Sequence, residues 1–270
     1  MIGREDEEAV MVIPHSQMYS VRDFATQATR RCVRAMYYHC NMPLRAVSEY
    51  RMESLRTAPK LIVVPSPRTL TESAWASLLK LAEDGSTILL SGFFDADDHW
   101  LSVPRSRQLG FTGSAKPVAQ EEFLTIDGVE YQLSYRGDRI ERIEKAFAGG
   151  AKHPEVLTIA RGKGRMIWSP LPVELAEDVR PAVGLYQYAL KQSNCIPVFT
   201  TDKRDSSVLV LPSVFENAVL YTLISEGERD ADVGITHQET GTAIVVHVSA
   251  QASEMVFLNR KDGQIISRTF

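Results

Sequence analysis

The chain of 270 residues has few cysteines and no long apolar run. Its three cysteines, Cys32, Cys40 and Cys195, are too few and too scattered for a disulfide framework or a zinc knuckle, so we expect buried free thiols. The longest apolar stretches, such as 61–64, are far too short to cross a bilayer, and we predict no membrane partner. The acidic N-terminus also lacks the basic and then apolar pattern of a secretory signal, so no cellular compartment is indicated.

Cationic side chains are not in excess either. With 30 Lys and Arg against 34 Asp and Glu, the net charge is −4, and no basic stretch suits a phosphate backbone. Nucleic acid is therefore not an expected partner. What the chain does have is a hydrophobic fraction of 44%, which is enough for a sizeable core, and a length that predicts two domains.

The first half of the chain alternates predicted strands and helices. A capping signal at Ser20 begins a helix that we expect to reach about Cys40. A second capping signal, at Thr69 with Glu72, begins another helix, for which Gly85 is a suitable end. Short apolar strands joined by helices favour an α/β fold with a doubly wound parallel sheet. The predicted strands are 9–14, 44–50, 61–67 and 86–92.

The pattern then changes to short alternating runs separated by Asp-Gly, Gly-Asp and Gly-Lys-Gly turns, which predict β-hairpins inserted into or extending the sheet. One more helix is predicted at 178–192, with Pro181 in its first turn or at a kink. After it, six short strands, with a hairpin signal in 259–264, predict a small antiparallel β-sandwich. We therefore expect an α/β domain over 1–193 and a β-sandwich domain over 197–270.

Three of the predicted parallel strands end in polar sequence, at "PHSQ", "PSPR" and "GFFDADDH". In an open parallel sheet, ligands bind beyond the carboxyl ends of the strands, so these side chains are candidates for one crevice. Trp100 is the tryptophan that we expect to be exposed, where it could touch a sugar or a neighbouring subunit. The alternative is ordinary loops in which aspartates cap the next helix. The candidate ligand-binding residues are His15, Gln17, Arg68, Asp95, Asp97, Asp98 and Trp100.

The acidic run at 95–99 also raises the question of a metal. Carboxylates and a histidine suit Mn²⁺, Ca²⁺ or Mg²⁺ in chemical type. However, no glycine spaces the ligands into a calcium loop, and no second His or Glu follows at helical distance. We therefore interpret the run as a solvated acidic turn, and we predict no metal and no cofactor.

The end of the fourth strand lacks a nucleophile. A strand-to-helix elbow that carries one has the form G-x-[Ser/Cys]-x-G, because the reacting group needs a strained and exposed backbone. Here Gly92 is followed by Phe93, Phe94 and Asp95, and phenylalanine cannot attack a substrate.

The order "VMVIP", a long helix and then "LIVVPSPRTLTESAWASLLKLAEDGSTILLSG" resembles the class I glutamine-amidotransferase-like domain, a flavodoxin-like fold. It is more closely similar to the version that follows the catalytic (β/α)8 barrel in some glycoside hydrolases, such as the family 42 β-galactosidases. In those enzymes a β-sandwich closes the chain, as "VLVLPSVFENAVLYTLISEGE" and "VFLNRKDGQII" do in this reading. The resemblance covers nearly all of the sequence.

Compared residue by residue, the resemblance implies that glutamine hydrolysis is lost. The cysteine of a working amidotransferase would fall at Phe93 or Phe94, and Ser169 and Leu171 stand where its histidine and glutamate would be. A "HPE" sequence does occur at 153–155, but it lies on the wrong side of a predicted hairpin, and we treat it as chance. No triad member is therefore in place.

Glycosidase chemistry needs two carboxylates across a sugar-binding cleft, and in the resembling enzymes that pair lies on the barrel. This chain has no barrel, which alone takes about 250 residues. Its glutamates are expected at the surface or at helix caps, and two of its tryptophans are expected in the core. These residues are Glu49, Glu72, Glu121, Glu122, Trp75 and Trp168.

The resemblance implies a non-catalytic accessory region of a glycoside hydrolase, present here without its barrel. Its expected partners are that catalytic barrel and further copies of itself, often as a trimer, and its expected role includes shaping the active-site entrance. Two alternatives stay open. One is an enzyme that uses the "GFFDADDH" crevice for metal-assisted hydrolysis, and the other is a free-standing carbohydrate-binding module.

Overall fold

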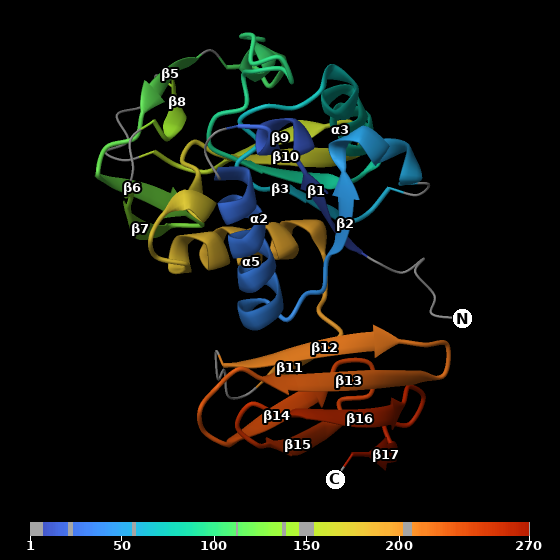
Figure 1. The fold of residues 1–270 in the computed structure, drawn as a ribbon. Helices are drawn as coiled ribbons and strands as arrows, with labels where there is room; N and C mark the ends of the chain where they lie inside the picture. Colours follow the sequence, from blue (N-terminus) through green and yellow to red (C-terminus); the bar gives the residue numbers. More distant parts are fainter. Residues whose placement is uncertain are drawn as a thin grey trace. The chain divides into compact units, whose positions relative to one another are not determined.

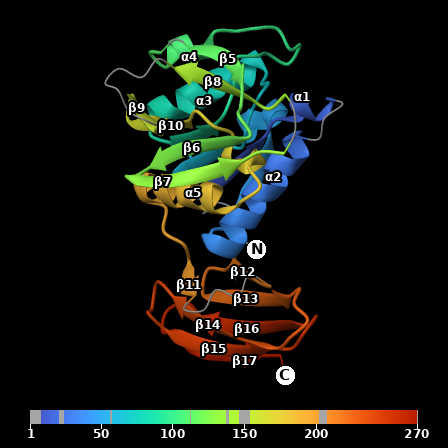
Figure 2. The same cartoon turned by 90° about the vertical axis from the view of Figure 1, so that its left-hand side faces the viewer.

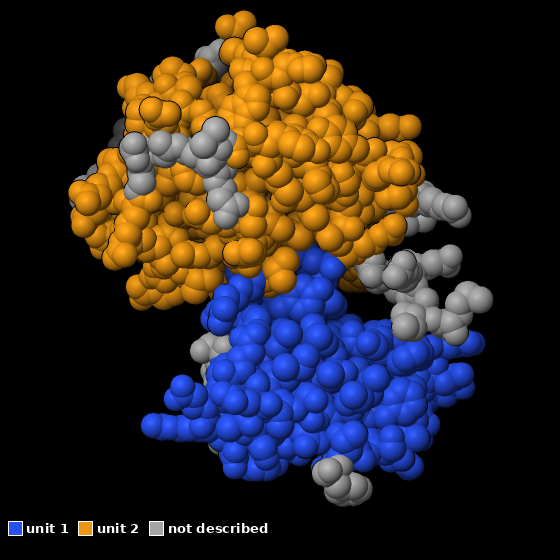
Figure 3. All heavy atoms as spheres, in the orientation of Figure 1, with its two compact units in different colours: residues 1–7, 34–44, 196–270 blue, residues 8–33, 45–195 orange. Residues whose placement is uncertain are grey.

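The computed structural model describes most of the chain. The described residues are 8–20, 24–55, 58–111, 113–136, 139–145, 154–201 and 207–269. The chain divides into two compact units, which Figure 3 colours separately. Unit 1 consists of residues 1–7, 34–44 and 196–270, and unit 2 of residues 8–33 and 45–195. Among the described residues, no helix has the length and apolar character that crossing a membrane requires.

The centre of unit 2 is a mixed sheet with the strand order β2-β1-β3-β4-β10-β9. The first five strands are parallel, and β9 pairs antiparallel with β10 at one edge (Figure 1). Every residue of β3 and β4 is buried, as expected for central parallel strands that are covered on both faces. The strands are β1 (Ala9–Ile13), β2 (Arg45–Ser48), β3 (Leu61–Val64), β4 (Thr87–Ser91), β9 (Leu157–Arg161) and β10 (Gly164–Ser169).

Helices cover both faces of this sheet. Helix α3 (Glu72–Asp84) lies on one face, and α2 (Phe24–Arg34) and α5 (Arg180–Ser193) lie on the other (Figure 1, Figure 2). Each helix buries an apolar stripe, which for α3 includes Trp75 and Leu78. The predicted mixed α/β architecture with a parallel sheet is therefore present.

Several predicted element ends need correction. Helix α3 begins two residues later than predicted, because the Thr71 hydroxyl accepts a hydrogen bond from the Ala74 N–H (3.1 Å) and Thr71 is therefore the N-cap. The helix ends at Gly85, whose φ of 127° suits glycine, as predicted. The third predicted helix begins at Arg180 and has Pro181 in its first turn.

The helix predicted from Ser20 to Cys40 consists of two parts. Helix α2 ends at Arg34 and continues as the π-helix η2 (Ala35–His39), while residues 21–23 lie outside the described part of the chain. The strand predicted over 44–50 stops at Ser48, because the Ser48 side chain accepts from the Tyr50 N–H and caps the 3₁₀ helix η3 (Glu49–Ser54).

Unit 2 also contains short helices and two separate two-stranded sheets, β5-β8 and β6-β7. The predicted Asp-Gly hairpin is confirmed between β6 and β7, where Asp127 and Gly128 both have positive φ (48° and 80°), as a tight two-residue turn requires. The Gly-Lys-Gly turn joins β9 to β10. The remaining elements of this unit are α1 (His15–Met18), α4 (Arg105–Gln108), β5 (Gly113–Pro117), β6 (Glu121–Ile126), β7 (Val129–Ser134), β8 (Glu141–Lys145) and η4 (Val173–Leu175).

Unit 1 contains two antiparallel sheets, with the strand orders β11-β14-β15 and β12-β13-β16-β17. Buried residues from both sheets form one hydrophobic cluster, an arrangement consistent with the predicted sandwich. The described part has one strand more than predicted, β11. The strands are β11 (Phe199–Thr201), β12 (Val208–Val214), β13 (Ala218–Ser225), β14 (Ala231–His237), β15 (Ala243–Val248), β16 (Ser253–Asn259) and β17 (Ile265–Arg268).

Unit 1 also includes a segment that the sequence analysis places in the α/β domain. Residues 34–44 group with the two antiparallel sheets, since η2 packs against β12. Tyr38 of this segment hydrogen-bonds Glu226, and burial is the main cause that raises the pKa of its phenol. Helical continuity along the sequence therefore does not mark the boundary of the unit.

Unit 1 contains a histidine whose side chain is fully buried. The His237 side chain is fully buried, its Nδ1 lies 2.7 Å from the Tyr221 hydroxyl, and its Nε2 has no hydrogen-bond partner among the described residues. Burial lowers the pKa of His237, and Glu239, 3.7 Å from Nε2, opposes this shift. The neutral imidazole is therefore the form that the folded state favours.

We predict that the free energy of unfolding falls as the pH drops below about 6.5, because the unfolded chain then binds a proton that the folded His237 does not. In His237→Gln this loss should be smaller. Urea unfolding of both proteins at pH 7.5 and pH 5 measures the difference. Equal pH dependence in the two proteins would contradict the assignment.

Candidate functional site

The candidate site is the edge of unit 2 where the parallel strands end. Chain segments after β1, β3, β4 and β10 all begin at this edge, as the sheet pairing requires. It is the usual ligand-binding position in an open parallel sheet.

Three of the predicted residues are joined in one chain of contacts. The Gln17 side chain, which is buried, accepts a hydrogen bond from the Arg68 N–H (3.0 Å). The Arg68 guanidinium lies 5.1 Å from the centre of the Trp100 ring and 2.7 Å from a carboxylate oxygen of Glu141. Trp100 is 41% exposed, as predicted, and adopts a positive φ of 63°.

His15 belongs to a neighbouring group. Its Nδ1 lies 2.8 Å from the Ser48 hydroxyl, and its ring centre lies 6.3 Å from that of Tyr50. Tyr50 is near Asp98, since Asp98 contributes, after burial and Glu49, to raising the pKa of the Tyr50 phenol. His15, Tyr50 and Asp98 therefore share one part of the rim.

Asp95 and Asp97 bind backbone groups of their own loop. Asp95 accepts from the Ser106 N–H (2.8 Å) and hydroxyl (2.7 Å) at the start of α4, and Asp97 accepts from the N–H groups of His99 (2.9 Å) and Leu101 (2.8 Å). These contacts fit the ordinary-loop alternative that the sequence left open: Asp97 completes a turn and Asp95 binds the first turn of α4, whose N-cap Pro104 has no side-chain cap. Within the described ranges, no three His, Cys, Asp or Glu side chains are grouped so that they could hold a metal ion.

A buried arginine that the sequence analysis missed holds this loop in place. The Arg105 side chain is fully buried and donates to the carbonyl oxygens of Ala96 (2.7 Å) and Leu70 (2.8 Å). Its guanidinium also lies 5.6 Å from the centre of the Trp75 ring. Burial lowers the pKa of Arg105, an effect that Glu72 opposes. The acidic loop is therefore anchored to the core.

Apolar side chains pack around the elbow after β4. Gly92 has a φ of 72°, and a Cβ there would meet Pro172 at 2.8 Å. Phe93 is half-buried, whereas Phe94 is fully buried and stacks on Trp75 with ring centres 5.6 Å apart. Trp168 meets Phe94 edge-on at 5.9 Å, and the core positions predicted for Trp75 and Trp168 are confirmed.

Beside this elbow lies a buried carboxyl group, Glu174 of η4, which the sequence analysis also missed. Its Oε2 accepts from the hydroxyls of Ser91 (2.5 Å) and Ser66 (2.8 Å), and its Oε1 accepts from Tyr186 (2.7 Å). Burial raises the pKa of Glu174, and the three hydroxyl donors oppose this shift. The group links the ends of β3 and β4 to helix α5.

Ser66 is the residue here that most resembles a nucleophile. It follows β3 with a positive φ of 44°, and its hydroxyl donates to a carboxyl group that could accept a proton. However, only 4% of Ser66 is exposed, and the adjoining cavity of about 20 Å³ has room for about one water molecule. A substrate carbonyl cannot approach the hydroxyl in this arrangement.

The other positions of the implied triad make structural contacts. The Ser169 hydroxyl donates to the Leu171 carbonyl oxygen (2.7 Å), and the Leu171 side chain is buried. In the "HPE" sequence, His153 lies outside the described residues, and the Pro154 carbonyl oxygen accepts from the Thr125 N–H (2.9 Å).

Of the two positions expected for Glu49, the surface and a helix cap, the surface is wrong. Its side chain is buried and accepts from the N–H groups of Ser16 (2.5 Å) and Thr71 (2.7 Å), so it joins the end of β1 to the start of α3. All three cysteines are buried thiols outside any disulfide, as predicted.

Comparison with known proteins gives structural matches only. No family model matches the sequence, and no curated protein does either. Gan42B, a GH42 β-galactosidase from G. stearothermophilus, matches with a TM-score of 0.66 and 14% identity over 94% of this chain and 40% of its own. The β-galactosidase from Bacillus circulans sp. alkalophilus matches with a TM-score of 0.68 and 11% identity, over 93% of this chain and 41% of its own. The β-galactosidase from Rahnella sp. R3 matches with a TM-score of 0.68 and 9% identity, over 94% of this chain and 41% of its own.

These matches define the fold. The chain is folded like part of a GH42 glycoside hydrolase and spans about 40% of the length of these enzymes.

We predict that Phe94→Ala lowers the free energy of unfolding by about 3–5 kcal/mol, because it leaves a cavity among Trp75 and Trp168. Phe93→Ala, at the half-buried neighbouring position, is the matched control and should cost less. Urea unfolding followed by tryptophan fluorescence measures both. A smaller loss for Phe94→Ala than for Phe93→Ala would contradict the described packing.

Glu174 should also give a pH-dependent stability, of opposite sign to that of His237. Its raised pKa means that the folded state keeps a proton that the unfolded chain releases, so the stabilisation is present below about pH 4.3 and is lost as the pH rises through the folded pKa. Glu174→Gln should remove this dependence. Tyr186→Phe deletes a hydrogen-bond donor that lowers the pKa of Glu174, so it should enlarge the pH dependence. Identical profiles for wild type and Glu174→Gln, measured by urea unfolding between pH 4 and pH 8, would refute this.

Proposed function

We propose that this chain is a non-catalytic accessory region of a glycoside hydrolase, with an α/β domain like that of class I glutamine amidotransferases. In this proposal it works beside a catalytic (β/α)8 barrel, assembles with further copies of itself and shapes the entrance to the active site. The observation that carries the proposal is Phe94, fully buried at the elbow where a nucleophile would have to be exposed. The fold match to about 40% of GH42 β-galactosidases supports the parent class.

The contacts of the carboxyl edge also favour a scaffold role. Glu174 is enclosed by three hydroxyl groups, and Asp95 and Asp97 bind backbone N–H groups. Carboxylate oxygens that already accept hydrogen bonds from the protein have few acceptor positions left for a substrate. The alternative of metal-assisted hydrolysis would need Asp95 and Asp97 to give up these bonds.

Self-assembly is supported by exposed apolar side chains on unit 1. Ile265 and Ile266 lie on β17, which is the last strand of its sheet, and are 42% and 54% exposed. Val245 on β15, the last strand of the other sheet, is 63% exposed. Exposed apolar residues on edge strands are typical of association surfaces.

The proposal predicts that the purified chain sediments as an oligomer and hydrolyses neither 4-nitrophenyl β-galactoside nor glutamine. Ile266→Asp should shift it toward the monomer, whereas Val129→Asp, also at an exposed apolar position but in unit 2, should not. Turnover that Glu174→Gln or Asp95→Ala abolishes would overturn the non-catalytic role. A monomer at all concentrations in analytical ultracentrifugation would overturn the assembly role.

A further inference from the structure

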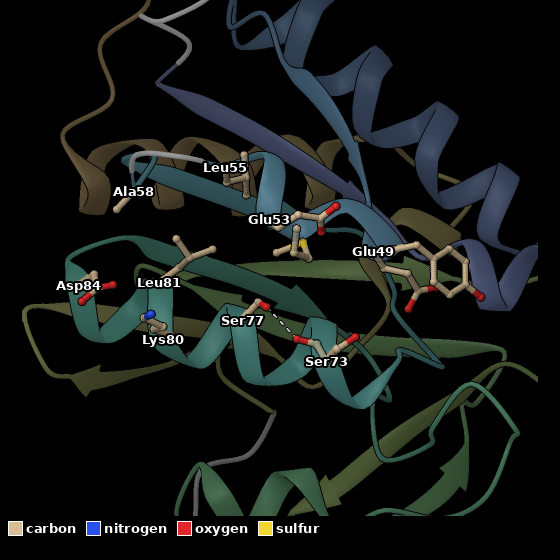
Figure 4. A pocket seen from close by; sticks show the side chains of 11 residues that line it. Glu49, Glu53, Leu55, Ala58, Ser73, Ser77, Lys80, Leu81 and Asp84 are labelled. Atoms are coloured by element: carbon tan, nitrogen blue, oxygen red, sulfur yellow. Dashed lines mark hydrogen bonds between the residues drawn. The ribbon is translucent and has the colours of Figure 1, made fainter.

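An open groove of about 370 Å³ lies between η3 and helix α3 of unit 2, beside the carboxyl edge of the sheet. Its volume is near the lower limit of ligand pockets, about 300–1,000 Å³. Figure 4 shows Glu53 of η3 and Leu55, directly after η3, on one side of the groove, and side chains of α3 on the other. The lining residues are Glu49, Tyr50, Met52, Glu53, Leu55, Ala58, Ser73, Ser77, Lys80, Leu81 and Asp84.

Helix α3 supplies five of the eleven lining residues. Ser73, Ser77, Lys80 and Asp84 follow one another at three- and four-residue spacing, which places them in a row along the helix (Figure 4). The buried stripe of α3 with Trp75 faces the core instead. The polar row on the groove side is therefore not required for packing the helix against the core.

Several polar groups in the groove are available for a ligand. The Lys80 and Asp84 side chains are exposed, and neither side chain has a hydrogen bond or an ion pair with any residue that the structure describes. Glu53 has one ion pair in that part of the chain, to Arg51 at 4.0 Å, which is the limit of such a contact. The Ser77 hydroxyl donates to the Ser73 carbonyl oxygen and so keeps its lone pairs free to accept. Glu49 differs, because both of its oxygens are occupied by N–H groups.

The groove also has apolar surface at its floor and at one end. Met52 is buried, and Leu55 and Leu81 are half-buried. Tyr50, at the end nearest the carboxyl edge, is 49% exposed, so that its ring offers an apolar face to a ligand.

We propose that this groove binds a short neutral oligosaccharide, of the size of a di- or trisaccharide. A sugar ring presents an apolar C–H face, which the Tyr50 ring fits, and an edge of hydroxyl groups that both donate and accept. Glu53 and Asp84 accept from such hydroxyls, and Lys80 donates to them. A phosphate or a sugar acid would be repelled by the Glu53 and Asp84 carboxylates, and a purely apolar ligand would offer no partner to Lys80 or Asp84.

This inference is independent of the accessory role. A saccharide groove is compatible with either a scaffold region or a free-standing module, and none of its groups belongs to the enclosed Glu174 network. Failure of one proposal therefore leaves the other in place.

Isothermal titration calorimetry of the whole chain tests the groove, with lactose, β-1,4-galactotriose, cellotriose and maltotriose as the probes. At least one should give saturable heat, and Tyr50→Ala should weaken its binding at least about tenfold. Tyr19→Ala is the matched control, because Tyr19 is 85% exposed and does not line the groove, and it should bind as the wild type does.

The charged groups provide a second set of variants on the exposed helix surface, where folding is little affected. Lys80→Ala and Asp84→Asn should each weaken saccharide binding severalfold, and Glu83→Gln, on the same helix but outside the groove, should not. No heat from any of the four saccharides would overturn the proposal, as would binding that Tyr50→Ala leaves unchanged. Heat from spermidine alone, lost in Asp84→Asn, would also overturn it by assigning the groove to a cation.

Discussion

The carboxyl edge of the sheet depends on the buried carboxyl group of Glu174. A carboxyl group removed from water is unfavourable in its charged form unless donors surround it, and here Ser66, Ser91 and Tyr186 each contribute one hydroxyl. These donors come from the ends of β3 and β4 and from α5, so satisfying one acid requires three distant segments to meet. The same requirement closes the place at which an enzyme with this kind of sheet would receive its substrate.

Much of the fold could be predicted because it follows from local chemistry. Wholly apolar runs such as Leu61–Val64 can be satisfied only in a covered sheet, and Asp127-Gly128 closes a hairpin by its backbone preference alone. The site was harder to predict, because Asp95 and Asp97 are of residue types that suit both capping and ligand binding. Only the positions of the N–H groups of Ser106 and Leu101 distinguish the two roles.

The residues that the sequence analysis missed have partners far away in the chain. Glu174 stands 108 and 83 positions from two of its donors, and Arg105 stands 35 from the Leu70 carbonyl. No local pattern marks either residue, because the groups that surround it come from other segments of the chain. The groove beside α3 shows a different case, because the sequence contains the polar row at helical spacing but does not show that η3 lies opposite it.

The membership of residues 34–44 has a consequence for how this protein can be divided. The two antiparallel sheets are completed by a segment encoded more than 150 positions before them, with η2 against β12 and Tyr38 bonded to Glu226. A gene fragment that starts at Ile196 would expose the surface of β12 that η2 covers. Transfer of the C-terminal sheets to another protein would therefore need to include residues 34–44 as well.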